Sequence, residues 1–175
     1  VHPSLRVNSI RELIDLAKKR PGELLYASSG IGGFPHLSTE LFKMMTKTSI
    51  THVPFKGGGP AAVDTLAGHT QLLFGSMPTV AGMINSGRLK LLATGGAKRN
   101  PNYPKVPTVA ETVPGYESTI WWGLFAPKTT SADTIATVHG LVSSTLTSPE
   151  LLRRLAEQGA VPAPMSSAEI GRAHV

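Results

Sequence analysis

The chain has 175 residues, of which 41% are hydrophobic and 16% are charged, and this balance is typical of a globular protein with a buried core. It contains no cysteine, which excludes disulfide bonds and thiolate metal sites. The formal net charge is +6, but the lysines and arginines are scattered without interleaved aromatic side chains, which argues against nucleic-acid binding. The six histidines are dispersed without the paired spacing of metal ligands, so we expect no metal and no cofactor.

Short apolar runs alternate with helical patterns along the first hundred residues. Ser9 and Glu12 have the spacing of a capping box at the start of a helix. The predicted strands cover residues 24–27, 50–53, 72–74 and 89–93. Helices are predicted at residues 10–19, from Pro35 onward, from about Ala61 to a stop at Gly68, and after Pro78 to a stop at Gly87. Repeated strand, loop and helix units predict parallel pairing with right-handed crossovers, and hence an α/β layered domain.

The character of the sequence changes after Arg99, where prolines punctuate an irregular stretch. Thr108 and Glu111 have the spacing to cap a short helix. Residues 118–125 read as a strand, and we expect its adjacent Trp121 and Trp122 to pack in the core. Two amphipathic helices are predicted to follow, the second beginning at Pro149 after a Ser148 cap.

Two glycine-rich loops follow the first two predicted strands, and each leads into a helix. Their candidate ligand-binding residues are Ser28, Ser29, Gly30, Gly32, His36, Gly57, Gly58 and Gly59. Glycines let the main chain approach a ligand closely, and a helix N-terminus offers free N–H groups and the positive end of a dipole. Because the carboxyl ends of parallel strands meet at one edge of a sheet, we expect Ser76 and Thr94 to join them there. The sequence therefore predicts a site for a small anion, with no catalytic residue.

Enzyme functions fit these residues less well. The alternative is a hydrolase that uses Ser28 or Ser29 with His36, but the Gly-x-Ser-x-Gly motif is absent and no acidic residue is placed to orient the histidine. A dinucleotide site needs a third glycine that residues 30–33 lack at the required spacing. A phosphate-binding P-loop needs a lysine after its glycines, whereas Lys56 precedes them.

Several motifs, in order over nearly the whole chain, resemble the substrate-binding receptors of tripartite tricarboxylate transporters, called the Bug or TctC family. The matching pieces are residues 2–5, 9–13, 26–30, 36–37, 53–58, 60–61, 107–111, 114–117 and 122–127. No single piece is decisive, and the match depends on their order and spacing.

The resemblance implies a type II periplasmic binding protein fold, in which two lobes close like a Venus flytrap on a small organic carboxylate. It assigns residues 8–117 to a nearly complete second, ligand-binding lobe and residues 118–127 to a strand that crosses back to the first lobe. Residues 128–169 then form the C-terminal helical part of that first lobe, whose N-terminal portion has no counterpart here. The resemblance also implies a periplasmic location, membrane permease subunits as partners, and a monomer when complete.

Two departures from the family pattern are visible. Many relatives carry an aspartate after the aromatic residue of the segment Phe74-Gly75-Ser76, and its absence here argues against a ligand with an ammonium group. Both ends of the sequence look cut, no signal peptide is seen, and we expect residues 170–175 to be a non-native tail.

Overall fold

A computed structural model of the protein describes residues 1–172. The chain divides into two compact units, which we call unit 1 (Val1–Ile120) and unit 2 (from Trp121 onward). The boundary falls within residues 118–127, the segment for which the sequence predicts a crossing between lobes.

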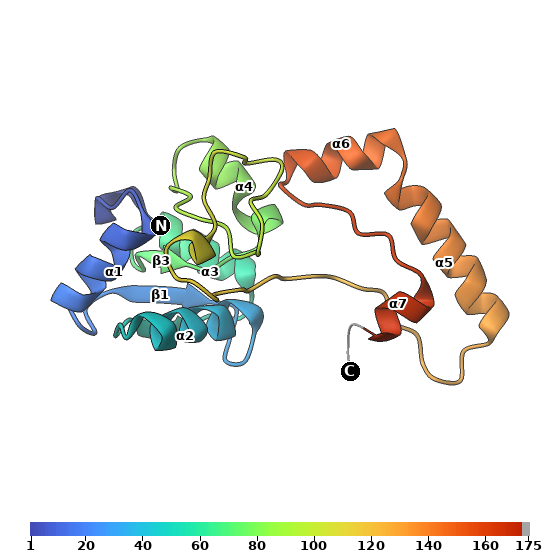
Figure 1. Ribbon diagram of the computed structural model, residues 1–175, viewed down its shortest axis with the longest axis horizontal. Coiled ribbons are helices and arrows are strands. Elements are labelled where there is room, and N and C mark those ends of the chain that lie inside the picture. Colours follow the sequence, from blue (N-terminus) through green and yellow to red (C-terminus); the bar gives the residue numbers. More distant parts are fainter. Residues whose placement is uncertain (173–175) are drawn as a thin grey trace. The chain divides into compact units, whose positions relative to one another are not determined.

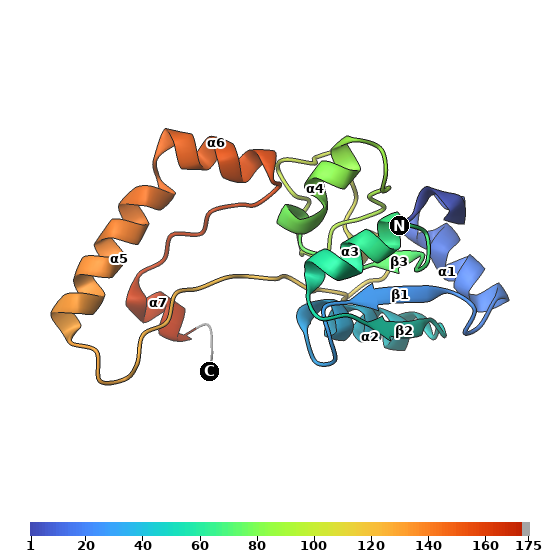
Figure 2. The ribbon, with the colours of Figure 1, turned by 180° about the vertical axis from the view of Figure 1, so that it is seen from behind.

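Unit 1 is built on a parallel sheet of three strands, β1 (Leu25–Ser28), β2 (Thr51–Pro54) and β3 (Leu72–Leu73). The order is β2-β1-β3, so β1 is central and both of its neighbours run parallel to it (Figures 1 and 2, with β2 labelled in Figure 2). In this register Tyr26 of β1 pairs with His52 of β2. The predicted α/β class with parallel pairing is confirmed.

Helices cover both faces of this sheet. They are α1 (Ile10–Lys19), α2 (Phe34–Thr46), α3 (Gly58–Leu66) and α4 (Met77–Asn85), with short 3-10 helices η1 (Pro3–Leu5) and η2 (Val109–Glu111). Two views from opposite sides show α2 along one face of the sheet and α3 on the other (Figures 1 and 2). Residues of α1 and α2, such as Leu13 and Phe42, share the larger apolar core with Tyr26, whereas α3 and α4 form a smaller core around Ala62 and Val80.

Local capping explains where several elements begin. The Ser9 hydroxyl accepts a hydrogen bond from the backbone N–H of Glu12, and α1 begins at the expected residue. The Glu12 carboxylate accepts a hydrogen bond from the N–H of Asn8, one residue before the position a capping box would use. The complete capping box that was predicted at Thr108 and Glu111 is present at η2.

The prediction of a fourth strand at residues 89–93 is wrong. Leu89 and Leu92 are buried, so the apolar pattern is real. The backbone hydrogen bonds of this region go to two different segments. Lys90 exchanges hydrogen bonds with Val1, and Thr94 forms an isolated bridge with Thr108. No continuous ladder with one neighbour results, and therefore no strand.

The predicted strand at residues 118–125 is also not formed. Trp121 and Trp122 are 54% and 64% exposed, so the expectation that both pack in the core is wrong. Trp121 contacts the ring of Phe125, with 6.1 Å between ring centroids. Alternating hydrophobic residues specify a strand only where a neighbouring strand is present to complete the hydrogen bonds.

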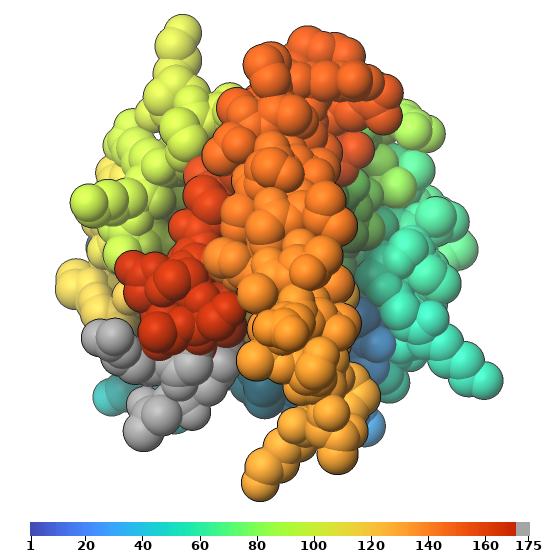
Figure 3. Space-filling model, turned by 90° about the vertical axis from the view of Figure 1, so that its right-hand side faces the viewer, coloured from blue at the N-terminus to red at the C-terminus, as the bar shows by residue number. Residues whose placement is uncertain are grey.

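Unit 2 consists of three helices, α5 (Ala132–Leu146), α6 (Pro149–Glu157) and α7 (Ser167–Arg172). The two predicted amphipathic helices are thus confirmed, with Ser148 capping α6. Figure 3 shows α5 in space-filling form, and Leu141 on this helix is 63% exposed. Residues 170–172, the first part of the expected non-native tail, continue α7, and residues 173–175 lie outside the described residues. Across residues 1–172, every helix is too short or too polar to cross a lipid bilayer.

Candidate functional site

The carboxyl ends of the strands bring the two glycine loops together. The N–H of Phe55, just after β2, donates to the carbonyl oxygen of Ser28 at the end of β1 (2.9 Å). A Cβ atom added to Gly30 would lie 3.5 Å from the carbonyl oxygen of Phe55, and one added to Gly58 would lie 3.7 Å from the methyl group of Thr79. The first loop therefore adjoins the second, and the second adjoins the first turn of α4.

The three helices that begin at this edge have no side-chain cap. Gly33, Gly57 and Ser76 are the N-cap residues of α2, α3 and α4, and none makes a capping hydrogen bond through a side chain. The helices elsewhere are different, because α1, α5 and α6 are each capped by a serine hydroxyl. Pro35, Pro60 and Pro78 have no N–H group, and the N–H of Thr79 donates to the carbonyl oxygen of Ser76 (3.0 Å). The remaining first-turn N–H groups, such as those of Gly58, Gly59 and Met77, are left for another acceptor, together with the positive ends of three helix dipoles.

The loop backbone has conformations that favour glycine. Gly30, Gly32 and Gly57 have φ angles of 126°, 78° and 119°, values that residues with side chains rarely adopt. Gly59, by contrast, has no atom within 4 Å of an added Cβ and no positive φ. The strand-to-helix connections can therefore stay short, with main-chain N–H groups near the surface.

The predicted side-chain donors differ in how accessible they are. Ser28 is fully buried, and its hydroxyl contacts the imidazole Nε2 of His52 and the backbone of Gly30, whereas Ser29 is partly exposed. The Ser76 hydroxyl is hydrogen-bonded to that of Thr79 (2.8 Å). The contacts of Ser28 give it a role in holding the loop.

Thr94 lies at the end of the segment that pairs with residues 107–109. Its side-chain oxygen is buried and has no hydrogen-bond partner within residues 1–172. The neighbouring Gly95 carbonyl accepts from the N–H of Ser118, whose hydroxyl contacts that of Ser38 in α2. The contacts that join the two glycine loops to α4 do not extend to Thr94, whose part in binding stays a prediction.

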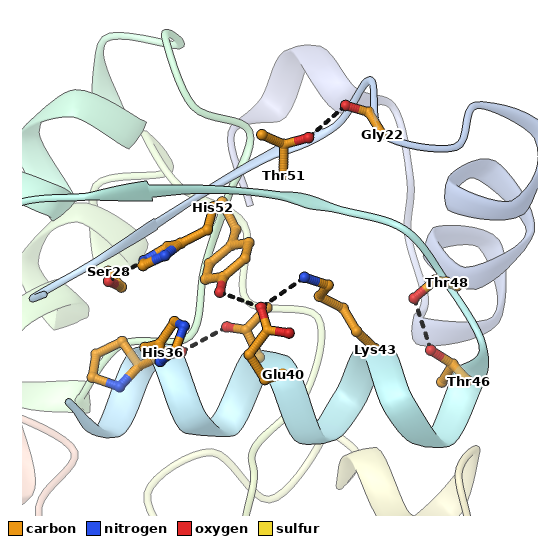
Figure 4. A network of polar contacts seen from close by, with 12 residues as sticks. Gly22, Ser28, His36, Glu40, Lys43, Thr46, Thr48, Thr51 and His52 are labelled. Atoms are coloured by element: carbon orange, nitrogen blue, oxygen red, sulfur yellow. Dashed lines mark hydrogen bonds and ion pairs between the residues drawn. The ribbon is translucent and has the colours of Figure 1, made fainter. Parts of the chain in front are cut away.

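A polar network beneath the first glycine loop includes a residue that the sequence reasoning missed (Figure 4). His52 lies 2.6 Å from the Ser28 hydroxyl through Nε2, and its ring contacts the rings of Tyr26 and His36, with centroid distances of 4.7 and 4.5 Å. His36 in turn accepts a hydrogen bond through Nδ1 from the N–H of Gly32 (3.2 Å). Both histidines therefore support the loop from the side of α2.

Charged groups complete this network on α2. The Glu40 carboxylate accepts hydrogen bonds from the Tyr26 hydroxyl and the Lys43 ammonium group, both at 2.6 Å. Burial of the Glu40 carboxyl favours its neutral form, but these two hydrogen bonds outweigh burial and hold its pKa below the ordinary value. Burial, with a smaller contribution from the charge of His36, lowers the pKa of His52, which favours a neutral imidazole.

The pairing of serine and histidine differs from the hydrolase alternative. Ser28 contacts His52, not His36, and because Ser28 is fully buried its hydroxyl cannot reach a substrate. Within residues 1–172 no group of three or more histidine or acidic side chains is placed to hold a metal ion. The loops also carry exposed side chains, among them Ile31, which is 81% exposed, and Lys56.

The signal that could have revealed His52 is strand periodicity combined with register. Side chains alternate across a strand, so Tyr26 and Ser28 point to the same face of β1. Because His52 is paired with Tyr26, it points to that face too, toward α2. The sequence gives the alternation but not the register, and the histidine was considered only as a possible metal ligand.

A parallel sheet whose strand ends gather uncapped helix N-termini is an α/β arrangement suited to binding a small anion. The profile of the family described as "Tripartite tricarboxylate transporter family receptor" matches residues 1–173, and the chain belongs to this family. The chain is 37% identical to protein BugT of Bordetella pertussis over 162 residues. This alignment covers 92% of the chain and 50% of BugT.

Solved structures of similar proteins show the same fold. R. palustris Rpa4515 with adipate superposes with a TM-score of 0.94 at 38% identity, over 99% of this chain and 58% of that one. MatC from Rhodopseudomonas palustris with bound malate gives a TM-score of 0.83 at 27% identity, over 94% of this chain and 58% of that one. The chain thus spans about half the length of BugT and somewhat more than half of these structures.

Proposed function

We propose that this chain supplies the ligand-binding lobe of an extracytoplasmic receptor that captures a small organic carboxylate. The observation that carries the proposal is the group of three uncapped helix N-termini at one edge of the sheet. Main-chain N–H groups there donate to a carboxylate, and each charge-assisted hydrogen bond contributes about 1.5–3 kcal/mol. The adipate and malate of the similar structures are ligands of this kind.

We further propose that the ligand is a dicarboxylate in preference to an amino acid. The loops at residues 29–33, 55–59 and 74–79 contain no acidic side chain, and Lys56 is their one charged residue. A ligand ammonium group would find no carboxylate in these loops to pair with, and burying it unpaired is costly. The site's donors instead match two anionic ends.

The remaining parts of the proposal concern the complete receptor. Residues 8–117 form its second lobe, residues 118–127 cross back, and residues 128–169 belong to the first lobe. The exposed apolar side chains of α5, such as Leu141 and Val142, support this assignment, because such a surface normally packs against further structure. The receptor acts as a monomer in the periplasm and delivers its ligand to the permease subunits of a tripartite transporter.

A thermal-shift screen tests the proposed function. Adipate and malate are expected to raise the melting temperature saturably, because a ligand that binds only the folded state stabilises it. Dimethyl adipate, which has the same chain length without charge, and lysine, which carries ammonium groups, serve as controls and are expected to have no effect. Equal stabilisation by the ester, or hydrolysis of the ester that is lost in Ser29→Ala, would contradict the receptor and favour the hydrolase.

A further inference from the structure

We propose that His52 is a positioning residue, which holds the first glycine loop in its ligand-binding conformation by fixing the hydroxyl of Ser28. The proposal rests on the proposed function, because it treats this loop as part of the carboxylate site. His52 itself stands on β2 beneath the loop, and it acts only through its neighbours.

The first step of the argument is the hydrogen bonding of Ser28. Its buried oxygen accepts from the N–H of Gly30 (3.1 Å) and also lies 2.6 Å from Nε2 of His52. The serine hydroxyl can donate to the Gly30 carbonyl oxygen (3.2 Å) while Nε2–H of His52 donates to the serine oxygen, or it can donate to an unprotonated Nε2. In both tautomers the short contact with His52 fixes the hydroxyl and leaves a lone pair for the Gly30 amide.

The second step is the fixation of the His52 ring. It stacks on Tyr26 with an interplanar angle of 17° and contacts His36 at 35°. Tyr26 is itself held by its hydrogen bond to Glu40, which is paired with Lys43. These aromatic and charged neighbours fix the ring, so that Nε2 is directed at Ser28 without reorganisation when a ligand arrives.

The third step is the shape of the loop. Gly30 adopts a φ of 126°, and Gly32 donates its N–H to His36. A segment with several glycines loses much conformational entropy when it is ordered, so an unheld loop would weaken ligand binding. The tethers at Gly30 and Gly32 order the loop before the ligand binds.

The test compares His52→Phe, which keeps an aromatic ring against Tyr26 but loses the polar atom, with His52→Gln, which keeps a polar atom but loses the ring. Hydrogen exchange of the Gly30 amide is measured by NMR in the ligand-free chain, and adipate affinity is measured by titration. We expect His52→Phe to accelerate Gly30 exchange and to weaken adipate binding, each about five- to tenfold, as for loss of one buried hydrogen bond. His52→Gln is expected to stay within about twofold of the unaltered chain in both measurements.

Ser28→Ala and the double variant Ser28→Ala/His52→Phe complete a cycle. If His52 acts through Ser28, the second substitution adds nothing to the first. Unchanged Gly30 exchange in His52→Phe, faster exchange with unchanged affinity, or additive effects in the double variant would each overturn the proposal. If the unaltered chain binds neither adipate nor malate even at concentrations far above micromolar, the proposed function is wrong, and the exchange rates still show whether His52 orders the loop.

Discussion

Gly57 has the most restricted backbone of the residues at the site. Its φ of 119° and ψ of 166° fall in a region that is essentially open only to glycine. It is the N-cap of α3, directly before the two residues whose N–H groups open that helix. Replacing it therefore changes the direction in which these groups point.

Gly57→Ala is expected to destabilise the chain by about 1–3 kcal/mol, the usual cost of forcing a side chain into such a conformation. Gly59→Ala is the matched control, because an added Cβ meets no atom within 4 Å there. We expect it to be neutral or stabilising by about 0.4–1 kcal/mol. Urea unfolding followed by circular dichroism measures both, and equal effects of the two substitutions would be inconsistent with the strain assigned to Gly57.

Residue-level prediction from sequence succeeded for backbone features and failed for side-chain partners. The glycines before the helices and the Ser9 cap could be predicted, because such features depend on residues that are close in the sequence. The partner of Ser28 depends on the register between β1 and β2, and the contacting residues Ser28 and His52 are 24 positions apart in the sequence. Such a pairing is set by tertiary packing, so the contact between Ser28 and His52 was not predicted. Ser28 was expected to contact the ligand.

Among the elements, the helices fall into two groups according to their first residue. Those that do not directly follow a strand are capped by serine, as at Ser9, Ser131 and Ser148. Those that begin at the strand ends start from glycine, or from a serine whose hydroxyl bonds to another side chain, as at Ser76 and Thr79. The absence of side-chain caps at these three helices lowers stability at this edge, and a bound anion would restore that stability.

Ser76→Asp tests this trade between stability and binding. Ser76 has the extended conformation of an N-cap, so an aspartate carboxylate can accept from the first turn of α4 and interact with its dipole. We expect a gain in stability of about 0.3–1 kcal/mol. The added negative charge is expected to weaken adipate binding about tenfold, equivalent to 1.4 kcal/mol.

Ser76→Asn is the matched control, since it provides a neutral cap of the same size. It is expected to keep most of the adipate affinity. Calorimetry and thermal unfolding measure the two effects separately. Unchanged adipate affinity in Ser76→Asp would show that the start of α4 takes no part in the site.

Element prediction was limited by what a strand needs from its neighbours. Strands β1 to β3 were predicted correctly, because each is part of a strand, turn and helix unit that repeats along the sequence. Residues 89–93 and 118–125 have the same apolar character without such a neighbour, and they form no strand. Leu92 is buried whereas Trp122 is exposed, so hydrophobicity alone did not predict which of these side chains is buried.

For the molecule as a whole, the proposed function gives the chain one face of a carboxylate site. Micromolar affinity requires about 8 kcal/mol after the entropic losses of association. A few charge-assisted hydrogen bonds and three helix dipoles, at about 0.3–1 kcal/mol for each dipole, fall short of this once those losses are subtracted. We therefore expect the 175-residue chain to bind adipate more weakly than micromolar.

The most direct test of the central claim, that main-chain N–H groups at the helix starts bind the carboxylate, is a titration of the isotopically labelled chain with adipate followed by amide NMR signals. The account predicts saturable shifts concentrated at Gly58, Gly59 and Met77, with a Kd weaker than micromolar. Dimethyl adipate should leave these signals in place. Shifts spread elsewhere, with the amides of the two glycine loops and of α4 unmoved, would contradict it.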